Sequence, residues 1–330
     1  MEQAVRERWG VKACLHPNAA PGVCGKIIDA HTVQRSGALR EIVDSKNLVR
    51  TFYQSRPDES GRITPRTVGW RQASTFTGFC AVHDAVFEPV ERKLFTGTPE
   101  QCFLLSYRSI CFEMYQKSGS ERSNPIMAEL VDRGLPLGAQ QRAQEILGVM
   151  RLGVQKGRKD AEIVKEFMDR QLLIGDYREW RWLILEFTGP LSITTCGAIS
   201  PNVGLSGEQL QVLHDLNSEV QWLTVNVVPT QSGGALVLGH SVGAVASTRF
   251  VDELNALNDD QLMQILPQFV FAYIENCYFS ESWWTSLSSE QQKLVTQHAG
   301  NLNPYYSVPS YEESMLVPWI MSERRMIEPT

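Results

Sequence analysis

Cysteine and histidine side chains gather near the start of the chain, where they could bind a metal or form a catalytic site. Three of the six histidines and three of the seven cysteines lie before residue 84. Cys80 and His83 are three residues apart in GFCAVHDAVFEPVE, and a single turn can deliver two ligands at that spacing. Cys14, His16 and Cys24 offer the other half of a ligand set. Because zinc takes three or four sulfur and nitrogen ligands, the pattern predicts a zinc site.

A third histidine, His31, interrupts an apolar run in CGKIIDAHTVQRSGAL. A histidine in this position has three interpretations: a buried, hydrogen-bonded side chain, a further zinc ligand, or a catalytic group that titrates near neutral pH. The remaining cysteines each lie alone in an apolar element, so they are predicted to be buried, reduced thiols. They are Cys102, Cys111, Cys196 and Cys277.

The composition limits the class of protein. With 330 residues, of which 43% are hydrophobic, the chain can bury the cores of two or three ordinary domains. It has an odd number of cysteines, no apolar stretch of membrane-spanning length, and an N-terminus, MEQAVRERWG, without a hydrophobic segment. These features predict a cytoplasmic protein without a membrane span, whose thiols are reduced or metal-bound.

Charge is distributed unevenly along the chain. Residues 1–75 contain 12 Lys and Arg against 7 Asp and Glu, a balance of +5, whereas the remaining residues have a balance of −11. The basic segment is also the one rich in cysteine and histidine. Such a distribution is typical of a nucleic-acid-facing module attached to an acidic body. The arginines of a solvated, loop-rich segment would produce the same balance.

The elements that must position these residues divide the chain into three parts. Residues 1–96 carry short apolar runs broken by Pro, Gly and Asn, which predict a small, loop-rich module. Residues 97–176 form a helical connector: an amphipathic helix begins after Thr98, breaks at KSGSERSNP, and is followed by a second helical region from about residue 136 to 173. Residues 177–330 alternate β-branched runs with turn residues and then become helical. The predicted class is α+β, with a mainly antiparallel C-terminal sheet covered by helices.

The segment GHSVG, residues 239–243, fits the G-x-S-x-G pattern of a serine-hydrolase nucleophile elbow at Ser241. Asp252 or Asp259 and His298 follow in the required order. However, only PTQSGG separates the preceding strand from the strand that leads to Ser241. Such a short connection favours a hairpin over the parallel crossover of a hydrolase sheet. A serine hydrolase is therefore a minor alternative.

Residues 10–95 resemble the HNH endonuclease-type treble-clef zinc finger, in the branch whose histidine lies in an AHIIP-like strand. The resemblance rests on a cysteine-containing knuckle, then IDAHTVQRSGAL, then KNL, then GFCAVHDAVFEPVE. It implies a zinc-bound module of ββα type at the N-terminus. Its implied zinc ligands are Cys14, Cys24, Cys80 and His83, with His16 as an alternate.

The same resemblance implies roles for three more residues. His31 corresponds to the general base that activates water, Asn47 to the asparagine that orients the loop, and Asp84 to the residue that helps hold a catalytic Mg²⁺ or Mn²⁺. The implied activity is phosphodiester cleavage in nucleic acid, as in a bacterial restriction or anti-phage effector. Three departures from the family pattern stand out. Ala30 precedes His31 where many active members have an acidic residue, and Asp29 is one residue further away. The third motif residue is Asp84 rather than His or Asn, and the gap from Asn47 to Cys80 is long.

The competing hypothesis is a protein without enzymatic activity. In it, the zinc finger is a scaffold, and the C-terminal domain binds a protein, a small ligand or a second copy of the chain. The apolar tail NPYYSVPSYEESMLVPWIM would pack across a surface or bind another subunit.

Overall fold

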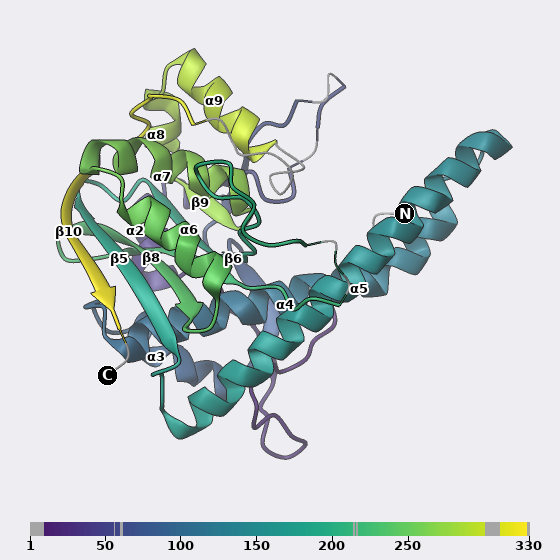
Figure 1. Ribbon diagram of the computed structural model, residues 1–330, viewed down its shortest axis with the longest axis horizontal. Coiled ribbons are helices and arrows are strands. Elements are labelled where there is room, and N and C mark those ends of the chain that lie inside the picture. The colour runs from purple at the N-terminus through teal and green to yellow at the C-terminus, as the bar shows by residue number, and fades with distance from the viewer. Residues whose placement is uncertain are drawn as a thin grey trace.

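The computed structural model describes residues 10–55, 57–59, 62–213, 215, 217–300 and 311–328 (Figure 1). Its body is an eight-stranded sheet with the order β10-β5-β8-β7-β6-β9-β2-β3. Neighbouring strands are antiparallel throughout. The predicted α+β class with a mainly antiparallel sheet is therefore confirmed. The strands are β2 (Leu48–Thr51), β3 (Arg66–Gly69), β5 (Trp180–Thr188), β6 (Ile193–Ile199), β7 (Leu223–Pro229), β8 (Gly233–Ser241), β9 (Cys277–Phe279) and β10 (Ile320–Ile327).

Both faces of this sheet are covered, so its central strands β6, β7 and β8 are buried along most of their length. Along β5, Leu183 and Leu185 belong to a core shared with the helices of the C-terminal half. Trp182 and Ile184, which alternate with them, belong to a second core shared with α4 (Pro99–Leu130). The other helices are α2 (Arg40–Ile42), α3 (Glu88–Glu91), α5 (Leu137–Ile174), α6 (Val245–Asn255), α7 (Asp259–Tyr273), α8 (Glu281–Ser286) and α9 (Ser289–Ala299).

Helix α4 begins as the sequence predicts, because the Thr98 hydroxyl accepts a hydrogen bond from the Gln101 N–H at 3.2 Å. It differs from the prediction in its burial. Every residue from Gln101 to Phe112 is buried, so this part of the helix is not amphipathic. The reason is its position: its apolar side chains share one core with the sheet and with Phe76 and Phe79 of the N-terminal segment. Residues 101–112 of α4 therefore have no face exposed to water.

The predicted break at KSGSERSNP is wrong, since α4 continues through it and ends only at Leu130. Helix α5 runs beside α4 as one continuous helix, and Lys117 of α4 lies close to Gly157 of α5. Packing against α5 outweighs the low helix propensity of Gly119 and Pro125. Figure 1 shows the outer ends of this helix pair extending beyond the sheet.

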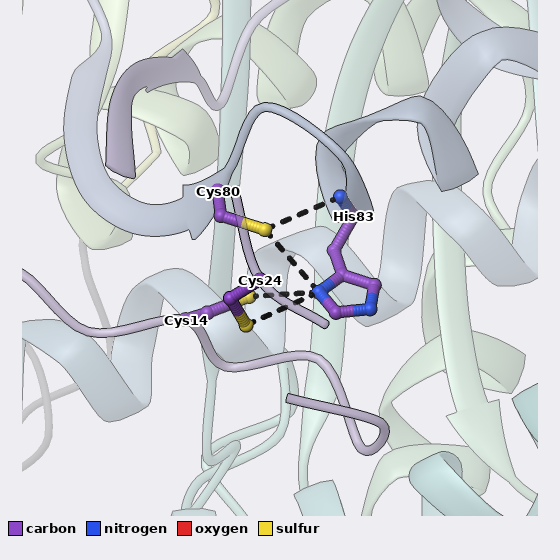
Figure 2. Close-up of side chains that lie close together, drawn as sticks. All are labelled: Cys14, Cys24, Cys80 and His83. Atoms are coloured by element: carbon purple, nitrogen blue, oxygen red, sulfur yellow. Dashed lines mark hydrogen bonds between the residues drawn. The ribbon is translucent and has the colours of Figure 1, made fainter. Parts of the chain in front are cut away.

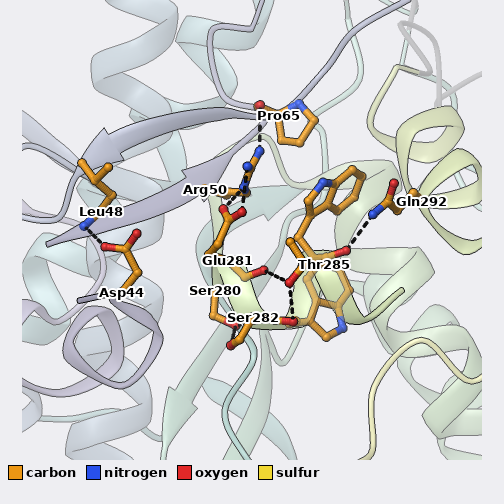
Figure 3. A network of polar contacts seen from close by, with 11 residues as sticks. Asp44, Leu48, Arg50, Pro65, Ser280, Glu281, Ser282, Thr285 and Gln292 are labelled. Atoms are coloured by element: carbon orange, nitrogen blue, oxygen red, sulfur yellow. Dashed lines mark hydrogen bonds and ion pairs between the residues drawn. The ribbon is translucent and has the colours of Figure 1, made fainter. Parts of the chain in front are cut away.

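The N-terminal segment contributes to two sheets. Strands β1 (Ile27–His31) and β4 (Thr75–Cys80) form a separate antiparallel pair. Between them, β2 and β3 join the large sheet through the pairing of β2 with β9. Arg50 of β2 also forms a two-point ion pair with Glu281 of α8, shown in Figure 3, in which Nη2 donates to Oε1 at 3.0 Å. The large sheet thus includes strands from both ends of the sequence.

The predicted hairpin before Ser241 is confirmed, because β7 pairs antiparallel with β8 from Thr224↔Gly239 to Pro229↔Gly234. Strand β8 is also antiparallel to its other neighbour, β5. His298, which a hydrolase triad would need, instead bonds through Nε2 to Gln268 Oε1 at 3.1 Å. Ser241 therefore ends an antiparallel strand rather than a strand of a parallel hydrolase sheet.

The C-terminal segment packs onto its own chain. A capping box of Ser288 and Gln291 begins α9. Of the apolar tail, residues 303–310 lie outside the described residues, whereas Leu316 and Trp319 are buried and β10 pairs with β5. Within the described ranges, no helix combines the length and the apolar character that crossing a membrane requires.

Candidate functional site

Three short elements bring the cysteines and His83 together. The loop before β1 lies along β4, where the Leu15 N–H donates to the Gly78 carbonyl at 2.8 Å. This loop carries Cys14 and Cys24. Cys80 is the last residue of β4, and His83 begins the 3-10 turn that leads into α3.

Figure 2 shows the four side chains converging on one point. The Nδ1 atom of His83 lies 3.4 Å from the sulfur of Cys14, 3.6 Å from that of Cys24 and 3.3 Å from that of Cys80. All four ligand atoms lie within 4.8 Å of one another. One ring nitrogen carries either one proton or one lone pair, so it cannot form hydrogen bonds with three sulfurs at once. The arrangement is instead one that could hold a metal ion.

Cys80 and Cys14 differ in how readily they lose a proton to form a thiolate. Burial raises the pKa of Cys80, but hydrogen bonds from the main-chain N–H groups of His83, Gly25 and Val82 outweigh it and bring the pKa to about 6. The pKa of Cys14 is raised to about 11, chiefly by burial, with a contribution from the nearby Cys80. A bound cation would stabilise the thiolates of both cysteines, although these negative charges lie close together.

His16, predicted as an alternate ligand, is placed differently. Its ring stacks on the ring of His83, with centroids 4.2 Å apart and an angle of 5° between the planes. Its Nδ1 accepts a hydrogen bond from the Asn18 N–H at 3.1 Å. The group of four consists of Cys14, Cys24, Cys80 and His83. His16 therefore covers the ring of a ligand and is outside the group itself.

His31 ends β1 and is partly buried. Burial lowers its pKa to about 4, helped by the positive charges of Arg35 and Arg108 and opposed by the backbone of Arg71 and the charge of Asp29. Its Nε2 atom is buried and has no hydrogen-bond partner among the described residues. A buried polar atom of this kind usually marks the place of a water or a ligand atom. His31 is thus a neutral base at pH 7 with one free lone pair.

Arg108 and Glu91, which the sequence pattern did not single out, form an ion pair next to the end of β1. Arg108 Nη1 donates to the main-chain carbonyl of His31 at 3.3 Å and to Glu91 Oε1 at 3.0 Å. Asp84 belongs to the same group of charges: burial raises the pKa of Asp84 to about 6, Glu91 adds to the shift, and Arg108 opposes it. A surface depression of about 170 Å³ is lined by Asp84, Glu91 and neighbouring side chains, including Glu88. Arg108 therefore joins the end of β1 to Glu91, and its charge acts on Asp84.

Asn47 is placed apart from this group. It lies at positive φ in the exposed turn before β2, where its N–H donates to the Asp44 carbonyl and its own carbonyl accepts from the Trp70 N–H. In the ranges that the structure describes, no hydrogen bond connects Asn47 with His31 or Asp84. Its positive φ suits asparagine, which tolerates the left-handed region better than most residues.

The lowered pKa of His31 predicts a specific loss of stability in acid. The unfolded ring has a pKa near 6.5, whereas the folded one has a pKa of about 4. Between these values the unfolded state binds more protons, so stability is complete above about pH 6.5 and decreases towards pH 4 by no more than about 3 kcal/mol. Urea unfolding from pH 7 to 4.5 should show a smaller decrease for His31→Gln than for the wild type. Equal pH dependence in the two proteins would contradict the assignment.

Comparison of the chain with protein-family models, with curated proteins and with solved structures found no match.

Proposed function

We propose that the cysteines and His83 bind zinc in a treble-clef module. Zinc–sulfur bonds of about 2.3 Å and a zinc–nitrogen bond of about 2.0 Å, at a tetrahedral angle, place sulfur and nitrogen about 3.5 Å apart. The three observed separations, 3.3, 3.4 and 3.6 Å, match this value. The order of elements also supports the proposal: a loop with two ligands, the β1–β4 pair, and a second ligand pair at a helical turn.

The function that the geometry supports best is metal-dependent cleavage of phosphodiester bonds in nucleic acid. The observation that carries it is the buried Nε2 of His31, which has no described hydrogen-bond partner, on a strand end that Arg108 joins to Glu91, whose charge in turn acts on Asp84. A general base needs an available lone pair at neutral pH, and a hard divalent cation needs carboxylate oxygens. The exposed Arg35 lies close enough to His31 for its charge to lower the pKa of the ring, and this charge suits an approaching phosphate.

Each residue then has a defined task. His31 Nε2 accepts a proton from the attacking water, and the backbone of Arg71 helps to hold the ring. Asp84 is a ligand for Mg²⁺ or Mn²⁺, an ion that would stabilise negative charge on the phosphate when it is bound. The zinc group holds the end of β4 and the turn after it, and so fixes Asp84, which directly follows His83.

Asp84→Asn tests the proposed cation ligand. The substitution should raise the Mn²⁺ concentration needed for half-maximal cleavage of a supercoiled plasmid by at least about tenfold, because an amide binds the ion less tightly than a carboxylate. Zinc content should stay near one per chain. Asp176→Asn is the control, since Asp176 forms an exposed ion pair with Arg178. An unchanged Mn²⁺ dependence in Asp84→Asn would contradict the role of Asp84.

A second candidate function is that of a zinc-stabilised scaffold without enzymatic activity. The placement of Asn47 favours it, because the residue expected to orient the site lies in an exposed turn without a described hydrogen bond to His31. In that case His31 would only stabilise the fold. The two candidates differ in the expected behaviour of the His31→Ala variant.

A further inference from the structure

Residues 106–109 of α4 join this helix to the large sheet, to α5, to β1 and to α3. The Ser106 hydroxyl pairs with the Thr224 hydroxyl of β7 at 2.8 Å, and the Ser109 hydroxyl donates to Asn226 Oδ1 of the same strand at 3.2 Å. Between them, Tyr107 donates to Asp169 of α5 at 2.7 Å, and Arg108 reaches the end of β1 and Glu91 of α3. The backbone that carries Arg108 is thus fixed to the large sheet on both sides.

Arg108 cannot itself contact a substrate, because only 1% of its surface is exposed. Its guanidinium carbon lies 5.0 Å from the centre of the Phe87 ring. The two N–H bonds of Nη1 serve two acceptors, the carbonyl of His31 and the carboxylate of Glu91. Burying an arginine costs free energy unless its charge is paired. These two hydrogen bonds therefore fix the positions of the His31 carbonyl and the Glu91 carboxylate.

We propose that Arg108 is a positioning residue. It holds the end of β1 against Glu91, and so aligns His31 with the carboxylates of Glu91 and Asp84. This inference rests on the proposed nuclease function. Helix α4, which lies outside the region that resembles an HNH finger, is then a necessary part of the active site. Because Ser106 and Ser109 attach this turn to β7, the large sheet provides the support against which the site is built.

The test compares Arg108→Gln with Arg108→Lys and with a matched control. Arg325→Gln also removes an arginine from an ion pair with a glutamate, Glu186, but on β10 and β5. In Arg108→Gln the kcat for plasmid nicking should fall by roughly 10- to 100-fold, whereas KM and zinc content stay within about twofold. Arg108→Lys should recover part of kcat, and Arg325→Gln should retain all of it. An unchanged kcat in Arg108→Gln, or a loss of kcat matched by loss of zinc, would overturn the proposal.

A second readout does not depend on activity. In protein labelled with ¹⁵N-histidine, NMR titration follows the pKa of the His31 ring. The positive charges of Arg35 and Arg108 lower the pKa of the ring, and the negative charge of Asp29 raises it. Arg108→Gln should raise the pKa of His31 and change its ring shifts, and Arg325→Gln should do neither. If the wild type cleaves no substrate, the proposed function fails, and this titration still decides whether Arg108 positions His31. An unmoved His31 signal in Arg108→Gln would then refute it.

Discussion

Cys80→Ser should release the metal and unfold the N-terminal module. Cys80 is fully buried, contributes one of three sulfurs around His83 Nδ1, and has main-chain N–H groups nearby that lower its pKa and favour the thiolate. A serine hydroxyl is a poor zinc ligand, and structural zinc contributes on the order of 10 kcal/mol to the folding of small modules. Metal analysis of freshly purified protein should show about one zinc per chain in the wild type and close to none in the variant.

The large sheet should survive this substitution, because its core lies mainly in other elements. Limited proteolysis should therefore cut Cys80→Ser within residues 10–47 and leave a resistant C-terminal body. Cys102→Ala is the matched control: Cys102 is equally buried, in α4, but does not belong to the group of four ligands. Equal zinc content in wild type and Cys80→Ser, or no zinc in the wild type, would contradict the metal site.

His31→Ala should abolish cleavage while the fold and the zinc remain. Loss of a general base costs roughly 10²- to 10⁴-fold in rate. The His31 ring has no described hydrogen bond to Cys14, Cys24, Cys80 or His83, so its removal should leave this group intact. Single-turnover cleavage, zinc content and thermal unfolding are to be measured on the same preparation.

His298→Gln is the control for this variant, because His298 is also buried but bonds to Gln268 in the C-terminal half. It should cleave at the wild-type rate. The scaffold hypothesis predicts a different result, in which His31→Ala loses stability and the wild type has no activity to lose. A variant that cuts as fast as the wild type would exclude His31 as the base.

The four residues that could hold a metal ion could be predicted because their signal is partly local. Cys80 and His83 are three residues apart, and one turn presents both to the same point. Cys14 and Cys24 reach the same point because their loop runs along β4. The hydrogen bond from the Leu15 N–H to the Gly78 carbonyl holds the loop there. From the sequence, His83 was the implied ligand and His16 an alternate, since both lie near cysteines. The structure separates them, because only His83 follows directly from the strand that ends at Cys80.

Arg108 and Glu91 could not be assigned from sequence, because their contact joins two helices across a tertiary interface. A signal was nevertheless present: Arg108 is the single charged residue in the apolar run from Phe103 to Phe112. Charged side chains are almost never fully buried without a partner, so this arginine indicated a buried ion pair. The identity of the partner required the packing of α3 against α4.

The organisation of the chain was predictable in outline and less so in its connections. The strands from Trp180 to Ser241 were predictable because β-branched runs alternate with turn residues, and the short PTQSGG connection indicated the hairpin. The pairing of β2 with β9 was not, because two short strands more than 200 residues apart carry no local signal of each other. The same tertiary effect extends α4 through Gly119 and Pro125, which local propensity alone would have excluded from a helix.

The most direct test of the account is a cleavage assay with wild-type protein that carries one zinc per chain. The protein is incubated with end-labelled single- and double-stranded DNA and RNA in Mn²⁺ or Mg²⁺, and with a mild chelator that removes these ions but leaves the zinc. We expect cleavage of at least one of these substrates. This cleavage should require the added ion and should stop when the chelator is present. Absence of cleavage in all four substrates, by protein with full zinc content, would contradict it.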